Sequence, residues 1–268
     1  SFLNVVAMRY NPEKDIFDFK NLGGPTHCPK CNQMLAWYEL IPILSFIFLH
    51  GHCRTCHQKI SWRYPIVELL SALAFISPFY FFNFYHSNLI VASIWVLAFL
   101  AFIFLSLIDL RFYVIPDSLN IFLAILGVVK IFLLYFVHKT EYFYTSFLGG
   151  YALLFSVTEN FWLNYFLAAL VGLVFFGTII YISKGRGMGM GDLKLIVPLG
   201  ILLGWPDILF TILTSFVIGG AVGAVLMLRR KKTMKDAVPF GPFIVLGALT
   251  TIFFGETLLR LYFSAFNL

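Results

Sequence analysis

The chain of 268 residues carries a formal net charge of +6, and 60% of its residues are hydrophobic while only 12% are charged. Soluble domains carry about 25% charged residues, so this composition leaves too little polar surface to cover a core in water. With a mean hydropathy of +0.88, the composition excludes a soluble globular protein and predicts a multi-span integral membrane protein.

A short apolar start is followed by a polar segment. Residues 1–8 are apolar, and we expect them to be the end of a first transmembrane helix that is truncated at residue 1. Residues 9–65 form the only extended polar segment and hold all four cysteines. A segment this short cannot build a large core, so we predict a small extramembrane domain that needs a disulfide or a bound metal ion to stabilise it.

Residues 66–268 predict an all-α transmembrane domain. A helix needs about 20 apolar residues to cross the hydrocarbon core of a bilayer. Apolar runs lie at 66–85, 89–108, 118–138, 161–182, 193–204, 208–228 and 241–263, and of these the run at 193–204 is short for a crossing. Together with the truncated first helix, they predict about eight crossings. Residues 142–157 are also apolar, but we expect them not to span, because another crossing breaks the charge alternation described next.

The basic residues orient the predicted spans. Seven Lys and Arg lie within 9–65, and most of the others lie in the regions around Arg111, Lys184 and Arg229. With the spans above, all of these regions fall on one side of the membrane, which is the positive-inside pattern of cytoplasmic loops. We therefore predict that residues 9–65 are cytoplasmic, and the net charge needs no nucleic-acid partner.

The four cysteines form two C-x2-C pairs, Cys28 with Cys31 and Cys53 with Cys56, separated by 21 residues. Two such pairs place four thiolates around one tetrahedral ion, and cytoplasmic thiols stay reduced, which disfavours disulfides. We predict a structural zinc site, because four sulfur ligands leave no position for water. A redox-active C-x-x-C pair is the alternative, and the lack of a thioredoxin-like βαβ pattern counts against it.

Two aspartates, Asp109 and Asp192, lie at the cytoplasmic ends of predicted spans. Ionisable side chains at membrane depth are costly and are functional by default. Two carboxylates held together share one proton, so that one acts as a base and the pair activates water, as in an aspartyl protease. The alternatives are a loop charge pair of Asp109 with Arg111 and a helix N-cap for Asp192. Asp117 fits an N-cap or a positioning residue, and Asp207 fits a cap on the opposite face.

Several short motifs follow one another in a characteristic order. They are S-F-L-N-V-V at 1–6, E-L-I-P-I-L-S at 39–45, R-Y-P-I-V-E at 63–68, I-D and I-P-D within 108–117, G-M-G-D at 189–192 and P-F-G-P at 239–242. With the two cysteine pairs, this set resembles the type IV prepilin peptidase family, membrane aspartyl proteases of the GxGD type. The resemblance covers nearly the whole chain. Leu40 departs from the family's pattern, in which asparagine is usual at that position.

The resemblance implies cleavage of the leader peptide from type IV prepilins or type II secretion pseudopilins at the bacterial inner membrane. It implies that Asp109 and Asp192 are the catalytic pair. Many family members then methylate the new N-terminal amine with S-adenosylmethionine. No G-x-G-x-x-G loop marks a standard site for this methyl donor. Glu39, Tyr64 and Glu68, which lie in or beside the cysteine domain, are the candidates for binding it.

Two other functions fit parts of the sequence. One is a peptidase without methyltransferase activity. The other is a proton-coupled membrane transporter, which also uses intramembrane carboxylates. Both aspartates lie at one face and no inverted repeat is apparent, which disfavours the transporter. The predicted partners are prepilin-like substrates and the lipid bilayer, and the oligomeric state stays open.

Overall fold

The computed structural model describes residues 2–10, 26–28, 30–83, 89–138, 146–157, 160–185, 187–230 and 238–266. In these ranges the chain is helical, and its β pairing is limited to two isolated bridges, His27 with Met34 and His52 with Lys59. The prediction of an all-α fold is confirmed for this part of the chain. The chain divides into two compact units, residues 1–112 and 113–268, and each is described by itself.

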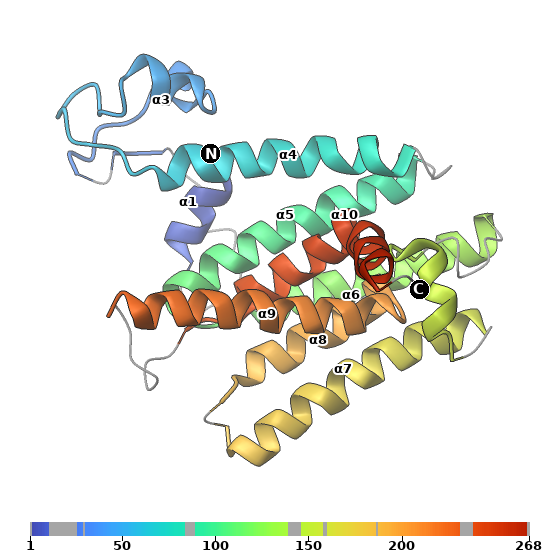
Figure 1. Cartoon of the computed structure of the whole chain (residues 1–268). Helices are drawn as coiled ribbons and strands as arrows, with labels where there is room; N and C mark the ends of the chain where they lie inside the picture. The colour runs from blue at the N-terminus through green and yellow to red at the C-terminus, as the bar shows by residue number, and fades with distance from the viewer. Residues whose placement is uncertain are drawn as a thin grey trace. The chain divides into compact units, whose positions relative to one another are not determined.

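The first unit is built on two long helices, α4 (Arg63–Asn83) and α5 (Leu89–Phe112), which pack side by side (Figure 1). The short helix α1 (Phe2–Arg9) packs against both of them. Between α1 and α4, the described part of the polar segment forms two short helical elements, η1 (Trp37–Leu40) and α3 (Leu44–Phe48). This polar segment carries the cysteines.

Two long-range hydrogen bonds tie the start of α4 and the end of α1 to the end of α5. The guanidinium of Arg63 donates to the carbonyl of Leu107 at 3.3 Å, and that of Arg111 donates to the carbonyl of Ala7 at 3.5 Å. The last turn of α5, which carries Asp109, therefore lies at the same end of this unit as the polar segment.

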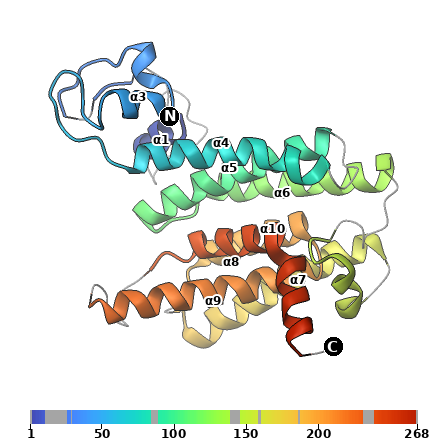
Figure 2. The ribbon, with the colours of Figure 1, turned by 45° about the horizontal axis from the view of Figure 1, so that its top comes forward.

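The second unit contains α6 (Asp117–Phe132), α7 (Phe161–Ser183), α8 (Met190–Leu203), α9 (Asp207–Leu228) and α10 (Gly241–Ala265). Helix α8 packs against both α6 and α7, and α9 packs along α10 (Figure 2). The α8 leucine and isoleucine side chains that are fully buried are Leu195, Ile196, Leu199, Leu202 and Leu203. Gly200 permits the close approach of α7, because a Cβ there would lie 2.7 Å from the Ala169 backbone.

Five helices in the described ranges are long and apolar enough to cross a membrane: α5, α7, α9, α10 and α6 extended by the π-helical turns of η2 (Leu133–His138). The protein is therefore a multi-pass membrane protein. Helix α4 covers most of the predicted span at 66–85 but is not one of these five. Helix α8 has 14 residues, about 21 Å at 1.5 Å per residue, which is less than the ~30 Å hydrocarbon core. The predicted total of eight crossings thus remains a prediction.

Residues 146–157 contain a short 3-10 helix, η4 (Gly149–Phe155), instead of a transmembrane helix. Its seven residues cover about 14 Å at ~2.0 Å per residue, and residues 142–145 of the predicted non-spanning stretch lie outside the described residues. Asp207 holds this segment, since its carboxylate accepts hydrogen bonds from the Ser146 hydroxyl at 2.7 Å and the Phe147 N–H at 3.1 Å. Asp207, predicted as a cap, therefore anchors a neighbouring segment, and α9 has no side-chain capping bond.

Candidate functional site

The four cysteine sulfurs form one cluster in the first unit. All four lie within 4.8 Å of one another, and the Sγ atoms of Cys28 and Cys56 are 3.9 Å apart. A tetrahedral zinc ion with Zn–S bonds of about 2.3 Å holds its sulfurs about 3.8 Å apart. Cys28 and Cys53 are buried, and Cys31 and Cys56 are half-buried. These four residues are thus close enough to bind a single metal ion, as the two C-x2-C pairs predict.

Each cysteine pair lies in the same kind of turn. In both pairs the backbone N–H of the first cysteine donates to the carbonyl five residues later, at 2.9 Å. The residue after the second cysteine has a positive φ, 56° for Asn32 and 54° for His57. Asn and His occupy this region more readily than most residues, so the turn itself explains their presence. Two equivalent turns present the four sulfurs to one point.

The cysteine thiols differ in acidity. The pKa of Cys28 is lowered to about 7, chiefly by a hydrogen bond from the Cys31 backbone. The pKa of Cys31 is raised to about 11, because desolvation and the neighbouring sulfurs together outweigh the lowering effect of the Gln33 backbone N–H. Four thiolates this close repel one another, and a bound dication removes that repulsion.

A cavity of about 360 Å³ lies beside the cysteine cluster in the first unit. Its wall includes Glu39, Tyr64 and Glu68, together with Cys28 and Cys53. Burial raises the pKa of the Tyr64 phenol above its ordinary value. The structure therefore brings together the three residues that the sequence motifs nominate for binding the methyl donor.

Both glutamates also stabilise the backbone around this cavity. The N–H of Ala36 donates to the Glu39 carboxylate at 2.8 Å, at the start of η1. The N–H of Ile43 donates to the Glu68 carboxylate at 2.9 Å. Ile43 has a φ of 63°, which is uncommon and strained for a β-branched residue, so Glu68 holds this turn from α4. Each glutamate thus has a structural role.

Asp192 lies in the first turn of α8, and only 7% of it is exposed. It is not the N-cap, which is Gly189, but its carboxylate accepts a hydrogen bond from the Gly189 N–H at 3.2 Å. The adjacent Gly191 lies against Ile115, since a Cβ on Gly191 would lie 3.2 Å from the Ile115 Cβ. The I-P-D motif at 115–117 and the G-M-G-D motif therefore meet within the second unit.

A salt bridge reinforces this meeting. The Lys194 ammonium lies 2.8 Å from a carboxylate oxygen of Asp117. Asp117 is the first residue of α6, whose N-cap is Pro116. Of the two roles predicted for Asp117, the structure favours a positioning residue. The pairing with Lys194 was not predicted, because the two residues are 77 positions apart in the sequence.

Asp109 lies in the last turn of α5, and 4% of it is exposed. The neighbouring Arg111 donates to the Ala7 carbonyl and lies over the ring of Phe112, with its Cζ 5.0 Å from the ring centroid. Asp109 belongs to the first unit and Asp192 to the second, so the pairing of the two carboxylates stays a prediction.

One buried charge carries no clear signal in the sequence. Lys130, near the end of α6, is 2% exposed and donates to the carbonyl of Leu202 at the end of α8. Its ammonium lies 5.2 Å from the centroid of the Tyr165 ring. The carbonyl groups in the last turn of a helix lack partners within that helix, and Lys130 satisfies one of them. The sequence alone shows Lys130 only as a basic residue near the end of a predicted span and does not indicate this partner.

The fold and these groups define a class: a multi-pass membrane protein with a four-cysteine cluster in a polar segment and a buried aspartate beside a glycine-rich turn. Comparison with known families is more specific. Residues 1–82 match the bacterial peptidase A24 N-terminal domain, and residues 95–224 match the type IV leader peptidase family. The chain belongs to the type IV leader peptidase family, as the motifs predict.

Several curated relatives support this assignment, each named prepilin leader peptidase/N-methyltransferase. The Burkholderia pseudomallei protein is 32% identical over 85% of this chain and 66% of its own length. The Aeromonas hydrophila protein is 31% identical over 99% of this chain and 90% of its own length, and the Pseudomonas aeruginosa protein is 29% identical over 96% and 80%. No solved structure matches the chain.

Proposed function

We propose that this protein removes the leader peptide from prepilins or pseudopilins and then methylates the new N-terminal amine. The family and the names of the relatives support both activities. The observation that carries the proposal is the buried Asp192 carboxylate, which sits on a glycine-rich turn packed against the I-P-D motif. An aspartyl protease needs a carboxylate fixed in this way.

Asp109 and Asp192 are the proposed catalytic pair. In an aspartyl protease one carboxylate is ionised and takes a proton from water, while the other is protonated and donates to the scissile carbonyl. Two observations support this assignment. First, both side chains are buried. Second, Ile115 lies against Gly191, the neighbour of Asp192, and Asp109 is only six residues before Ile115 in the sequence. The Gly189 N–H orients one oxygen of Asp192.

The proposed topology places both aspartates at the cytoplasmic face of a bacterial inner membrane. Residues 1–8 end a first span, residues 9–65 form a cytoplasmic domain, and residues 66–268 form the protease domain, with about eight crossings in all. The cluster of Arg229 and Arg230 after α9 supports a cytoplasmic location for that end of the helix.

We propose Cys28, Cys31, Cys53 and Cys56 as the four ligands of a structural zinc ion. The separations of the four sulfur atoms fit tetrahedral coordination of one zinc ion with Zn–S bonds of about 2.3 Å. Zinc bound by four thiolates holds chain segments together and has no open position at which to activate water. The residues around the cluster would then keep the cavity beside it in shape, since Cys28 and Cys53 contribute to its wall.

That cavity is the proposed site of methyl transfer. S-adenosylmethionine supplies an electrophilic methyl group, which passes to the neutral amine as the carbon–sulfur bond breaks. Glu39 and Glu68 line the cavity and offer carboxylates to a sulfonium cation, and one of them can accept the proton that the amine loses. Arg54 and Lys59, also in its wall, offer positive charge to the carboxylate of the methyl donor.

A peptidase without methyltransferase activity is the second candidate. It is favoured by the hydrogen bonds of Glu39 to Ala36 and of Glu68 to Ile43, which give each glutamate a purely structural reason to be present. Purified protein in lipid vesicles, incubated with a prepilin and S-adenosylmethionine, decides between the two. Mass spectrometry of the product is expected to show loss of the leader and gain of one methyl group. Leader removal without methylation would leave the peptidase alone, and an unshortened substrate would reject both.

A further inference from the structure

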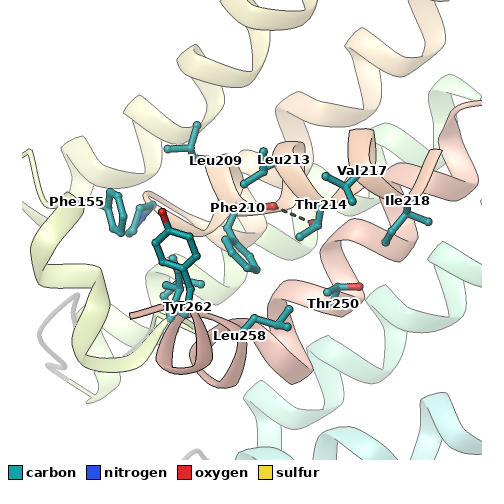
Figure 3. A pocket seen from close by; sticks show the side chains of 13 residues that line it. Phe155, Leu209, Phe210, Leu213, Thr214, Val217, Ile218, Thr250, Leu258 and Tyr262 are labelled. Carbon is teal, nitrogen blue, oxygen red and sulfur yellow. Dashed lines mark hydrogen bonds between the residues drawn. The ribbon is translucent and has the colours of Figure 1, made fainter. Parts of the chain in front are cut away.

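The second unit contains a groove that the proposed chemistry does not use. It has a volume of about 590 Å³ and lies between α9, the part of α10 from Thr250 to Tyr262, and the η4 segment (Figure 3). Phe155 and Tyr262 lie at one end, Phe210 and Leu258 lie along its walls, and Ile218 lies at the other end. Nothing in the proposed peptidase or methyltransferase reactions explains a groove at this place.

Beside the groove, α9 and α10 pack closely. At the close point a Cβ on Gly247 would lie 2.1 Å from the Ser215 hydroxyl oxygen, and the Thr211 and Thr251 hydroxyls are 2.9 Å apart. Beyond this point α10 bends, as Figure 2 shows. Further along α10, the Glu256 N–H donates to the carbonyl of Phe147, at 3.2 Å, in the segment that leads into η4.

The walls of the groove are almost entirely hydrocarbon. Three hydroxyl groups line it, those of Thr214 and Thr250 and that of Tyr262 at one end. The Thr214 hydroxyl donates to the carbonyl of Phe210 at 2.8 Å, and the Thr250 hydroxyl donates to the carbonyl of Leu246 at 2.8 Å. Both threonine hydroxyls therefore already donate to carbonyls of the protein and leave no free donor for a ligand. A ligand with polar groups inside the groove would lose hydrogen bonds to water without compensation.

The groove is also half a bilayer long. It extends along α9 from Leu209 to Ile218, ten residues separated by a rise of about 14 Å at 1.5 Å per residue, whereas the hydrocarbon core is about 30 Å thick. At its Leu209 end, the Trp205 indole N–H donates to the carbonyl of Phe155 at 2.7 Å, and Tyr262 lies nearby. Trp and Tyr with one polar end are typical of the membrane–water interface. The groove therefore runs from the interface to the bilayer centre.

We propose that this groove binds one acyl chain of a membrane phospholipid, from the leaflet on the side of the membrane where α9 begins. The groove continues into surfaces that already contact lipid, since 59% of Leu213 and 64% of Val217 are exposed on the membrane-spanning helix α9. An acyl chain of one leaflet matches its length and its lack of polar partners. A transmembrane helix of a substrate or of a second copy needs a groove along the full thickness of the bilayer.

The first test maps lipid contacts on the full chain in vesicles. The probe is a phosphatidylethanolamine with a diazirine on one acyl chain, and adducts are located by mass spectrometry. Phe166 and Val174 on α7 provide the reference, because they are exposed to a similar extent, 62% and 57%, and do not line this groove. We expect several-fold more adducts on groove residues than on this reference face. Equal labelling of both faces would overturn the proposal, and so would crosslinks between two chains at the groove.

The second test fills the groove. Thr214→Phe places a ring inside it, and Leu213→Trp places an indole at its exposed edge, where added bulk does not threaten folding. Val174→Phe on α7 is the matched control. Native mass spectrometry in detergent is expected to show one retained phospholipid in the wild type and in Val174→Phe, and a several-fold loss in both groove variants. Groove variants that fold and retain the lipid as the wild type does would contradict the proposal.

Discussion

The ammonium group of Lys194 lies 2.9 and 2.8 Å from the two carboxylate oxygens of Asp117. Lys194 lies near the start of α8, two residues after Asp192, and Asp117 is the first residue of α6. The pair therefore joins the starts of these two helices. The side chains are 50% and 63% exposed, so the pair contributes only about 0–1 kcal/mol to the free energy of unfolding. The role of this ion pair is to position the start of α8, which carries Asp192, against α6.

The first prediction tests this positioning role. Asp117→Asn and Lys194→Met should each lower the rate of leader removal moderately and leave the melting temperature nearly unchanged, because an exposed ion pair adds little stability. The double variant should be no worse than the more damaging single variant, since both remove one interaction. Cleavage assays on the three variants check this. Complete loss of cleavage in Asp117→Asn, with normal cleavage in Asp109→Asn, would instead make Asp117 the first catalytic aspartate.

The second prediction concerns the metal. Cys28→Ser and Cys53→Ser should each lower the zinc content measured by inductively coupled plasma mass spectrometry, because a tetrahedral site loses one of its four ligands. Thr55→Ser, in the same turn as Cys53 and Cys56, is the control and should keep one zinc per chain. Wild-type protein that contains no zinc, but does contain a disulfide among these cysteines, would refute the zinc site.

The third prediction separates the two reactions. Glu39→Gln and Glu68→Gln should reduce methylation of the mature N-terminus more than leader removal, because the two carboxylates line the cavity beside the cysteine cluster and take no part in hydrolysis. The ratio of methylated to unmethylated product, measured by mass spectrometry, checks this. If both reactions decline in parallel, the glutamates serve only to hold Ala36 and Ile43 in place.

The fourth prediction concerns the packing of α9 on α10. Gly247→Ala should lower the melting temperature, since the new Cβ would lie 2.6 Å from the backbone oxygen of Thr211 and 2.9 Å from the backbone nitrogen of Ser215. Overpacking of this kind costs about 1–3 kcal/mol. Gly220→Ala is the matched control, because no atom lies within 4 Å of its added Cβ. Equal stability of the two variants would show that the helices are not packed this closely.

The sequence predicts the helices of this protein well, because long apolar runs leave little choice of structure. The predicted runs at 161–182, 208–228 and 241–263 lie within two residues of α7, α9 and α10. The four-cysteine cluster was equally predictable, since C-x2-C spacing constrains the backbone locally. Composition gives no such guide to η4, which follows two residues held from a distance: Ser146 and Phe147 donate hydrogen bonds to Asp207, and the Phe147 carbonyl accepts one from the Glu256 N–H.

The site was predictable to a different degree. The motifs identify Asp192, Glu39, Tyr64 and Glu68, and the structure places the last three around one cavity. The sequence does not reveal which partners a charged residue has across the fold. Lys194 with Asp117 is an example, because the pairing depends on how α8 packs against α6 and not on any local pattern.

The fifth prediction, and the most direct test of the account, is the rate of leader removal by Asp109→Asn and Asp192→Asn. Asparagine keeps the shape of the side chain but neither ionises nor shares a proton, so each variant should lose cleavage entirely. Zinc content, helical circular dichroism and methylation of a pre-cleaved peptide should stay at wild-type levels, which would show that the fold is intact. Cleavage at the wild-type rate by either variant would contradict the catalytic pair.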